Sequence, residues 1–205
     1  DEDGKLLADQ MFVEVNNDTY YFENNIVITG SIILGDYIYD FGEDGKMVIG
    51  DKDGNVYGDD GKLIGSEIFV TVNNNTYYIV NNVIVKGELV INGFIYNFGA
   101  NGIMITGDFE GYTYDEEGKL VGNEIFVTIN NNTYYVVNNI TVTGTIVING
   151  YLYNFGETGE MAKGEVDGYT YGEDGKLVGD KIFVTINNNT YYIVNNITVT
   201  GDIII

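Results

Sequence analysis

Four tyrosines recur at one fixed spacing, and their type and pattern suit ligand binding better than any other set in this chain. They are Tyr20, Tyr77, Tyr134 and Tyr191, each 57 residues from the next. One tyrosine per repeat predicts a ladder of rings along one side of the folded chain. Exposed rings can stack on sugars, whereas packed rings hold neighbouring repeats together. The uniform spacing favours the packing role, because a binding site needs a shaped pocket with converging polar groups. Carbohydrate binding by these tyrosines is the alternative.

Carboxylates are the next candidates for chemistry. They recur in "EDGK" at 43–46, "DDGK" at 59–62 and "EEGK" at 116–119. Two carboxylates can serve as a catalytic acid and base, but an acid followed by glycine in every repeat is typical of a tight turn. "DKDGN" at 51–55 has the start of a calcium loop, yet the twelfth position, where such a loop needs Glu, is Lys62. We therefore expect turns here, with no metal site and no cofactor.

The missing residue types argue against catalysis. The chain has no His and no Cys, so the usual proton carrier near neutral pH and the thiolate nucleophile are absent. Serine occurs only at Ser31 and Ser66, and neither lies in a nucleophile-elbow pattern. No place in the chain carries a distinguishing constellation of side chains. We expect that the chain is not an enzyme.

The charge balance excludes two classes of partner. With 9 basic and 31 acidic residues the formal charge is −22, whereas nucleic acids and anionic membrane surfaces are bound by clustered Lys or Arg. No apolar run approaches the ~18 residues needed to cross a bilayer. We expect no nucleic-acid partner and no membrane insertion. The first ten residues, "DEDGKLLADQ", lack the layout of a signal peptide, so localisation is not assigned; a natural version would be secreted or on the cell surface.

The repeat predicts the architecture. The 57-residue repeat is itself built from three shorter units, because Tyr21, Tyr39, Tyr57 and Tyr78 are 18, 18 and 21 residues apart. "TIVINGYLYNF" at 145–155 places Asn-Gly between two β-rich stretches, which is a strong hairpin signal. Helical periodicity is absent. Isolated hairpins are barely stable, so each must pack on its neighbours. We predict an all-β fold, a β-solenoid of stacked β-hairpins with three hairpins, or 57 residues, per superhelical turn.

The prediction also fixes the organisation of the chain. Ten comparable units in about three and a half turns form a single repeat domain over residues 1–205. Residues 1–30 are a modified, cap-like first copy, with Glu14, Asp18 and Glu23 where later copies have uncharged residues. The last residues, Ile203–Ile205, are bare isoleucines, and end-to-end self-association through this C-terminal strand is a candidate interaction. The Asn-x-Thr triplets, at Asn17, Asn74 and equivalent positions, are interpreted as turn residues.

The repeats resemble a known family. "NGFIYNFGANGIMITG" at 92–107 and "YYIVNNVIVKG" at 77–87 are similar to the cell-wall-binding repeats of choline- and glucan-binding proteins, and more closely to the C-terminal repeats of the clostridial glucosylating toxins. The resemblance implies a β-hairpin solenoid that binds choline, glucans or cell-surface glycans on aromatic-lined surfaces. Tryptophan, on which choline cages rely, is absent, which argues against choline.

Two functions are compatible with these patterns. Cys, His, Pro, Trp and Arg are all missing and the repeats are uniform, which favours a non-catalytic structural scaffold, a designed or consensus β-solenoid with no natural ligand. The alternative is a carbohydrate-binding repeat module for a cell-wall or cell-surface glycan, with a glycan as partner.

Overall fold

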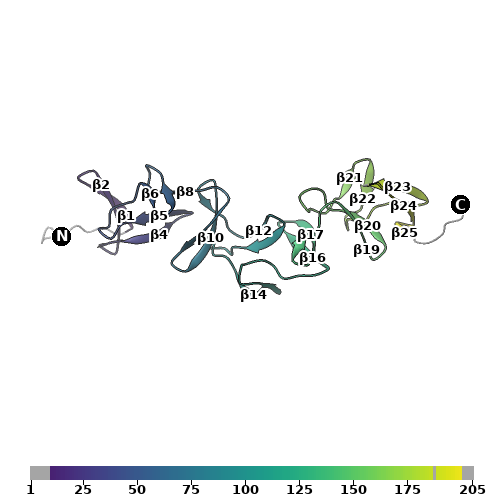
Figure 1. Cartoon of the computed structure of the whole chain (residues 1–205), viewed down its shortest axis with the longest axis horizontal. Coiled ribbons are helices and arrows are strands. Elements are labelled where there is room, and N and C mark those ends of the chain that lie inside the picture. Colours follow the sequence, from purple (N-terminus) through teal and green to yellow (C-terminus); the bar gives the residue numbers. More distant parts are fainter. Residues whose placement is uncertain (1–9, 187, 200–205) are drawn as a thin grey trace. The chain divides into compact units, whose positions relative to one another are not determined.

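The fold is described from a computed structural model, which covers residues 10–186 and 188–199 (Figure 1). Every regular element in this part of the chain is a β-strand. None of the described residues forms a helix that could cross a membrane. The predicted all-β class is confirmed.

The strands fall into two compact units, each described by itself. Of the described residues, unit 1 comprises 10–87 and 97–104, and unit 2 comprises 88–96, 105–186 and 188–199. The strands up to residue 87 are β1 (Met11–Val15), β2 (Asp18–Glu23), β3 (Ile26–Val27), β4 (Gly30–Leu34), β5 (Tyr37–Phe41), β6 (Gly50–Lys52), β7 (Asn55–Tyr57), β8 (Leu63–Ile64), β9 (Ile68–Val72), β10 (Asn75–Val80) and β11 (Val83–Ile84). Those that follow are β12 (Glu88–Ile91), β13 (Phe94–Asn97), β14 (Gly107–Phe109), β15 (Tyr112–Tyr114), β16 (Ile125–Ile129), β17 (Asn132–Val137), β18 (Ile140–Thr141), β19 (Thr145–Ile148), β20 (Tyr151–Asn154), β21 (Gly164–Val166), β22 (Tyr169–Tyr171), β23 (Ile182–Ile186), β24 (Asn189–Val194) and β25 (Ile197–Val199).

Each 57-residue repeat contains three small antiparallel sheets. The first is a three-stranded meander, as in β16–β17–β18, the second a hairpin, as in β19–β20, and the third a hairpin, as in β21–β22. The described residues form ten such sheets, in agreement with the ten units counted from the tyrosine spacing. The third hairpin of the first repeat carries an additional short strand, β8. The predicted arrangement of three hairpins per repeat is therefore confirmed.

The Asn-Gly turn predicted at 149–150 closes the β19–β20 hairpin. Asn149 and Gly150 have φ angles of 50° and 83°, and Ile148 pairs with Tyr151 on either side of them. Positive φ at both central residues is the type I′ geometry, which matches the twist of a hairpin. The two faces of β20 enter different cores, since Leu152 belongs to one buried cluster and Tyr153 to another.

Main-chain hydrogen bonds join hairpins of successive repeats within each unit. The amide of Ile84 donates to the carbonyl of Asp36 at 2.9 Å in unit 1. In unit 2 the amide of Thr141 donates to Gly93 O at 2.8 Å, and that of Thr198 to Gly150 O at 2.8 Å. These pairs are equivalent positions of the repeat, each 48 residues apart. A main chain that bonds to the preceding coil in a fixed pattern is characteristic of a β-solenoid.

Polar contacts accompany the altered residues of the first copy. Asp18 forms an ion pair with Lys46 at 2.9 Å, and Glu23 accepts a hydrogen bond from the side chain of Gln10 at 3.4 Å. The cap role of residues 1–30 and the single repeat domain over 1–205 stay predictions. Ile203–Ile205, on which the self-association prediction depends, lie outside the described residues.

Candidate functional site

The four tyrosines of the predicted ladder lie in the central strands of the three-stranded meanders. Tyr77 and Tyr134 are buried, with 4% and 7% of their surface exposed, and Tyr20 and Tyr191 are half-buried. Each faces a valine across its hairpin; Tyr134, for example, pairs with Val127. Tyr77 and Tyr134 belong to apolar core clusters. Their rings therefore pack within the fold. A direct role of the four tyrosines in carbohydrate binding stays a prediction.

The adjacent tyrosine column carries the ring-to-ring contacts. Tyr135 contacts Phe126 with ring centroids 4.8 Å apart, and Tyr192 contacts Phe183 at 4.7 Å. Phe126 and Phe183 are 42% and 58% exposed. These exposed phenylalanines were missed in the sequence analysis. The signal was present, because each phenylalanine lies opposite a tyrosine once the hairpin register is known.

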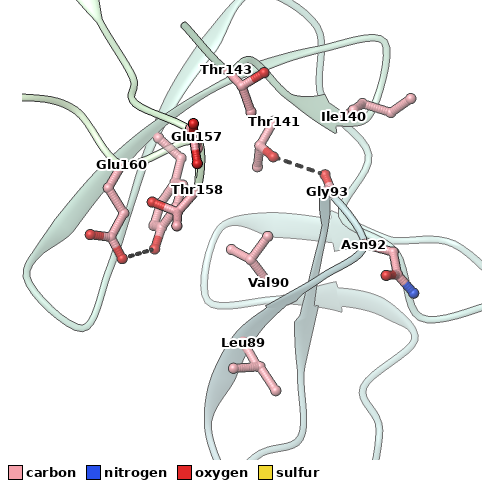
Figure 2. Close-up of a pocket in the computed structure, with 11 residues that line it drawn as sticks. Leu89, Val90, Asn92, Gly93, Ile140, Thr141, Thr143, Glu157, Thr158 and Glu160 are labelled. Atoms are coloured by element: carbon pink, nitrogen blue, oxygen red, sulfur yellow. Dashed lines mark hydrogen bonds between the residues drawn. The ribbon is translucent and has the colours of Figure 1, made fainter. Parts of the chain in front are cut away.

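A cavity of about 590 Å³ opens in unit 2 where three segments meet. The segments are the β12–β13 hairpin, the chain from β17 to just after β18, and the turn after β20. Its apolar walls are Leu89, Val90 and Ile140, and its polar groups come from Asn92, Tyr134, Thr141, Thr143, Glu157, Thr158 and Glu160. Figure 2 shows Glu157, Thr158 and Glu160 gathered on one side, with Asn92 on the other. Tyr134 is the one residue of the predicted ladder that lines this cavity.

The turn that carries the acidic residues is anchored by glycine and by the main chain. Gly159 has a φ of 85°, and a Cβ added there would lie 3.3 Å from the hydroxyl of Thr141. Only glycine allows both this conformation and this approach. The amide of Met161 then donates to Thr133 O at 2.7 Å. Glu160, between these two anchors, is thereby placed at the cavity wall.

Glu160 is oriented by two neutral donors. Its Oε1 accepts a hydrogen bond from Asn132 Nδ2 at 3.0 Å and another from the Tyr134 hydroxyl at 3.2 Å. Burial raises the pKa of Tyr134 above its ordinary value, and the negative charge of Glu160 raises it further. No lysine lines the cavity among the described residues. The site thus presents a positioned carboxylate next to apolar walls.

The same place in unit 1 has different side chains. Fifty-seven residues earlier, Glu157 and Glu160 are replaced by Ala100 and Ile103. Gly93 and Thr143 are replaced by Asp36 and Lys86, which form an ion pair. The cavity residues other than Tyr134 were not singled out from the sequence. The only available signal was this difference between copies, and nothing local indicated that the positions meet in space.

Smaller grooves recur elsewhere at matching positions of the repeat. One in unit 1, of about 460 Å³, is lined by Gln10, Tyr21 and β4 residues. One in unit 2, of about 290 Å³, is lined by Glu124, Tyr135 and the equivalent β19 residues. Because the same groove occurs in two repeats with the same tyrosine, it belongs to the scaffold, whereas the larger cavity depends on residues of one copy.

The acidic turns do not gather into a metal centre in the described part of the chain. Their carboxylates bond within their own turns: Asp60 Oδ1 accepts from the amide of Lys62 at 3.1 Å, and Asp174 Oδ1 from that of Lys176 at 3.2 Å. This agrees with their interpretation as turn residues. The pKa of Asp60 and that of Asp174 are lowered first by a hydrogen bond from the lysine side chain, and also by the amide bond.

Comparison with known proteins finds a similar streptococcal protein. It is 28% identical over 196 residues to "Glucosyltransferase-S" of Streptococcus mutans serotype c, a match that covers 86% of this chain and 13% of that protein. The chain resembles a natural protein over most of its length. It spans only a small part of that relative. No protein-family model matches it.

Solved structures similar to the chain include choline-binding proteins of Streptococcus pneumoniae. CbpJ is 21% identical, with a TM-score of 0.31 over 78% of this chain and 62% of that chain. Choline binding protein F, solved with a peptidoglycan analogue, is 16% identical, with a TM-score of 0.32 over 97% of this chain and 96% of that chain. Choline-binding and glucan-related proteins are the classes named from the repeat pattern. The fold assignment itself rests on the strand pairing described above.

Proposed function

We propose that this chain is a non-catalytic carbohydrate-binding repeat module whose ligand is a polymer of glucose. The match to a glucosyltransferase supports a glucose polymer as the ligand class. The observation that carries the proposal is the cavity of unit 2, whose volume of about 590 Å³ suits a small ligand. Ligand sites are typically concave and largely apolar, with a few placed polar groups.

The cavity offers each kind of contact that a sugar ring uses. The C–H face of a pyranose can lie against Leu89, Val90 and Ile140. This contact removes apolar surface of both partners from water, which is favourable. The second oxygen of Glu160, Oε2, is available to a sugar hydroxyl, since Asn132 and Tyr134 both donate to Oε1. A hydrogen bond to a charged group is worth about 1.5–3 kcal/mol net. One such bond with apolar contact gives weak, specific binding of a single sugar unit.

We infer that the module holds the polymer and does not cleave or extend it. The chain contains no His or Cys, and Glu160 is committed to hydrogen bonds with Asn132 and Tyr134. The chain corresponds to 13% of the glucosyltransferase, so the activity of that protein is not carried over here. Incubation with the oligosaccharides used below should release no reducing sugar above a protein-free control.

Calorimetric titration with isomaltoheptaose, maltoheptaose and cellohexaose tests the proposal. We expect millimolar or tighter binding to at least one of them, with one site per chain. The double substitution Glu157→Ala and Glu160→Ala should abolish it. Glu165→Ala with Glu173→Ala is the matched control, because it removes two carboxylates of unit 2 outside the cavity. If none of the three sugars gives a heat of binding, the proposal is contradicted.

A ligand-free structural scaffold is the second candidate. It is supported by the identical main-chain bonds of successive repeats and by the burial of Tyr77 and Tyr134. A designed origin gains no support from the comparisons. The same titration separates the two functions, because a scaffold without a ligand binds none of the sugars.

A further inference from the structure

The hairpin turn beside the cavity has a different geometry in the two units. In unit 2, Asn92 and Gly93 have φ angles of 51° and 81°, the type I′ pattern. In unit 1 the equivalent residues are Gly35 and Asp36, and only Gly35, at 63°, has a positive φ. A positive φ at the first central residue alone is the type II′ pattern. The second central residue can therefore carry a side chain in unit 1, whereas glycine suits that position in unit 2.

The side chain allowed in unit 1 is used for an ion pair. Asp36 Oδ1 accepts a hydrogen bond from Lys86 Nζ, and both side chains are about half exposed. The positions correspond to Gly93 and Thr143, which line the cavity of unit 2. A Cβ added at Gly93 would lie 3.5 Å from Ile140 Cγ2 and 3.8 Å from Thr141 Oγ1. A side chain at this position is therefore directed at the cavity wall.

One main-chain hydrogen bond between coils is the same in the two copies. The bond from Ile84 N to Asp36 O measures 2.9 Å, and that from Thr141 N to Gly93 O measures 2.8 Å. This bond thus holds the coils alike, and the copies differ in the type of the hairpin turn and in the side chains it carries. At these two positions unit 1 has the larger aspartate and lysine side chains, where unit 2 has glycine and threonine.

We propose that three positions decide which copy of the repeat site is open: Asn92, Gly93 and Thr143 leave the unit 2 site open, and Gly35, Asp36 and Lys86 close its counterpart in unit 1. The inference rests on the proposed function for the identity of the ligand. An exposed ion pair is weak, so closure comes from the volume of the two side chains. Raising the salt concentration therefore does not open the closed copy.

Transfer of the closed set into unit 2 tests the selection of the binding copy. The triple variant Asn92→Gly, Gly93→Asp and Thr143→Lys should raise the dissociation constant for isomaltoheptaose at least tenfold, at low and at high salt alike. Both turn residues are exchanged because aspartate at a φ of 81° would strain the turn. Asn149→Gly with Gly150→Asp makes the same turn exchange outside this cavity and should leave binding unchanged. Equal affinity of the triple variant and the wild type would overturn the proposal.

Thiol labelling tests the same inference without a sugar, because the chain has no cysteine of its own. Thr141→Cys and Ile84→Cys place one thiol at equivalent buried positions, 6% and 4% exposed in the native residues. With methyl methanethiosulfonate we expect at least tenfold faster labelling at position 141. The triple variant of unit 2 described above should slow labelling at position 141. The reverse exchange in unit 1, Gly35→Asn with Asp36→Gly and Lys86→Thr, should speed labelling at position 84.

The two measurements keep the failures apart. If the labelling rates match the expectation but the wild type binds no sugar, the proposed function is overturned. The inference of one open and one closed copy is then still supported. Equal labelling rates at positions 141 and 84 would overturn the inference even if sugar binds. Circular dichroism of each variant should match that of the wild type, which confirms that the exchanged turns still fold.

Discussion

The hydroxyl of Tyr134 donates a hydrogen bond to Glu160, with 3.2 Å between the two oxygens. Tyr134 belongs to the apolar core of unit 2, whereas Glu160 is exposed at the edge of the cavity. The pair therefore links a uniform feature of the repeat, the buried tyrosine, to a residue that only this copy carries. A scaffold residue thus orients a group at the site.

Glu160→Gln should weaken binding of the sugar and lower the pKa of Tyr134. The neutral amide keeps the size of the side chain but removes the charge that strengthens a hydrogen bond to a sugar hydroxyl, so we expect roughly a tenfold loss of affinity. The pKa of Tyr134 should fall toward its ordinary value while staying above it, because burial is the larger cause of its rise. Calorimetry and a ¹³C-tyrosine NMR titration measure the two effects. Glu165→Gln is the control; a Tyr134 pKa unchanged in Glu160→Gln would argue against the contact.

The stability of the fold should decrease between about pH 10 and pH 12. Burial, followed by the charges of Asp40 and Asp53, raises the pKa of Tyr57 to about 12. The folded state holds this proton more tightly than the unfolded chain, so its stabilising effect is complete below pH 10 and is lost as the pH rises to 12. A shift of two units corresponds to at most about 3 kcal/mol. Urea denaturation at pH 8 and pH 11.5 measures the loss, which should be smaller in Tyr57→Phe than in the wild type.

Phe155→Ala should be among the most destabilising single substitutions. The ring is fully buried and contacts Tyr135 and Tyr153, with centroids 6.1 and 6.2 Å away. Removal of a buried phenylalanine ring costs about 3–5 kcal/mol. Phe183→Ala is the matched comparison, since that ring is 58% exposed, and it should cost less than half as much. Similar unfolding midpoints in urea for the two variants would contradict the burial described here.

Gly175→Ala should destabilise unit 2 more than Gly168→Ala. The two glycines have φ angles of 76° and 79°. Alanine in this left-handed conformation lowers the free energy of unfolding by about 1–2 kcal/mol at either position. A Cβ at Gly175 would also lie 2.2 Å from the sulfur of Met161, whereas nothing lies within 4 Å of one at Gly168. The additional crowding should add about 1–3 kcal/mol. Thermal denaturation of the two variants gives the comparison, and the second substitution Met161→Ala should recover part of the loss in Gly175→Ala.

The hairpins were predictable because their signals are local. Asn149-Gly150 permits the positive φ angles of a two-residue turn, and the alternation of Tyr151, Leu152 and Tyr153 places neighbours on opposite faces. The exact 57-residue spacing then required each repeat to adopt the same structure. Turn chemistry, strand periodicity and repeat length all pointed to the same fold, and for that reason the class could be predicted from the sequence.

The cavity could not be predicted because it depends on contacts between distant segments. Val90, Thr143 and Glu160 belong to three different hairpins or turns. They are brought together by the bond from Thr141 to Gly93, the bond from Met161 to Thr133 and the approach of Gly159. The burial of Tyr134 depends in the same way on neighbours that the alternating pattern does not specify. Differences between repeats were visible in the sequence, but only the folded structure shows that the differing residues line one cavity.

The amide of residue 84, 141 or 198 bonds to a carbonyl of the preceding coil whichever side chain is present, and the hydroxyls of Thr141 and Thr198 add a second bond to the same carbonyl. Mutation can therefore diversify one copy of the repeat while its mechanical linkage is retained. A gene that encodes such an array can alter ligand choice copy by copy, and duplication of a 57-residue segment supplies fresh material for that divergence.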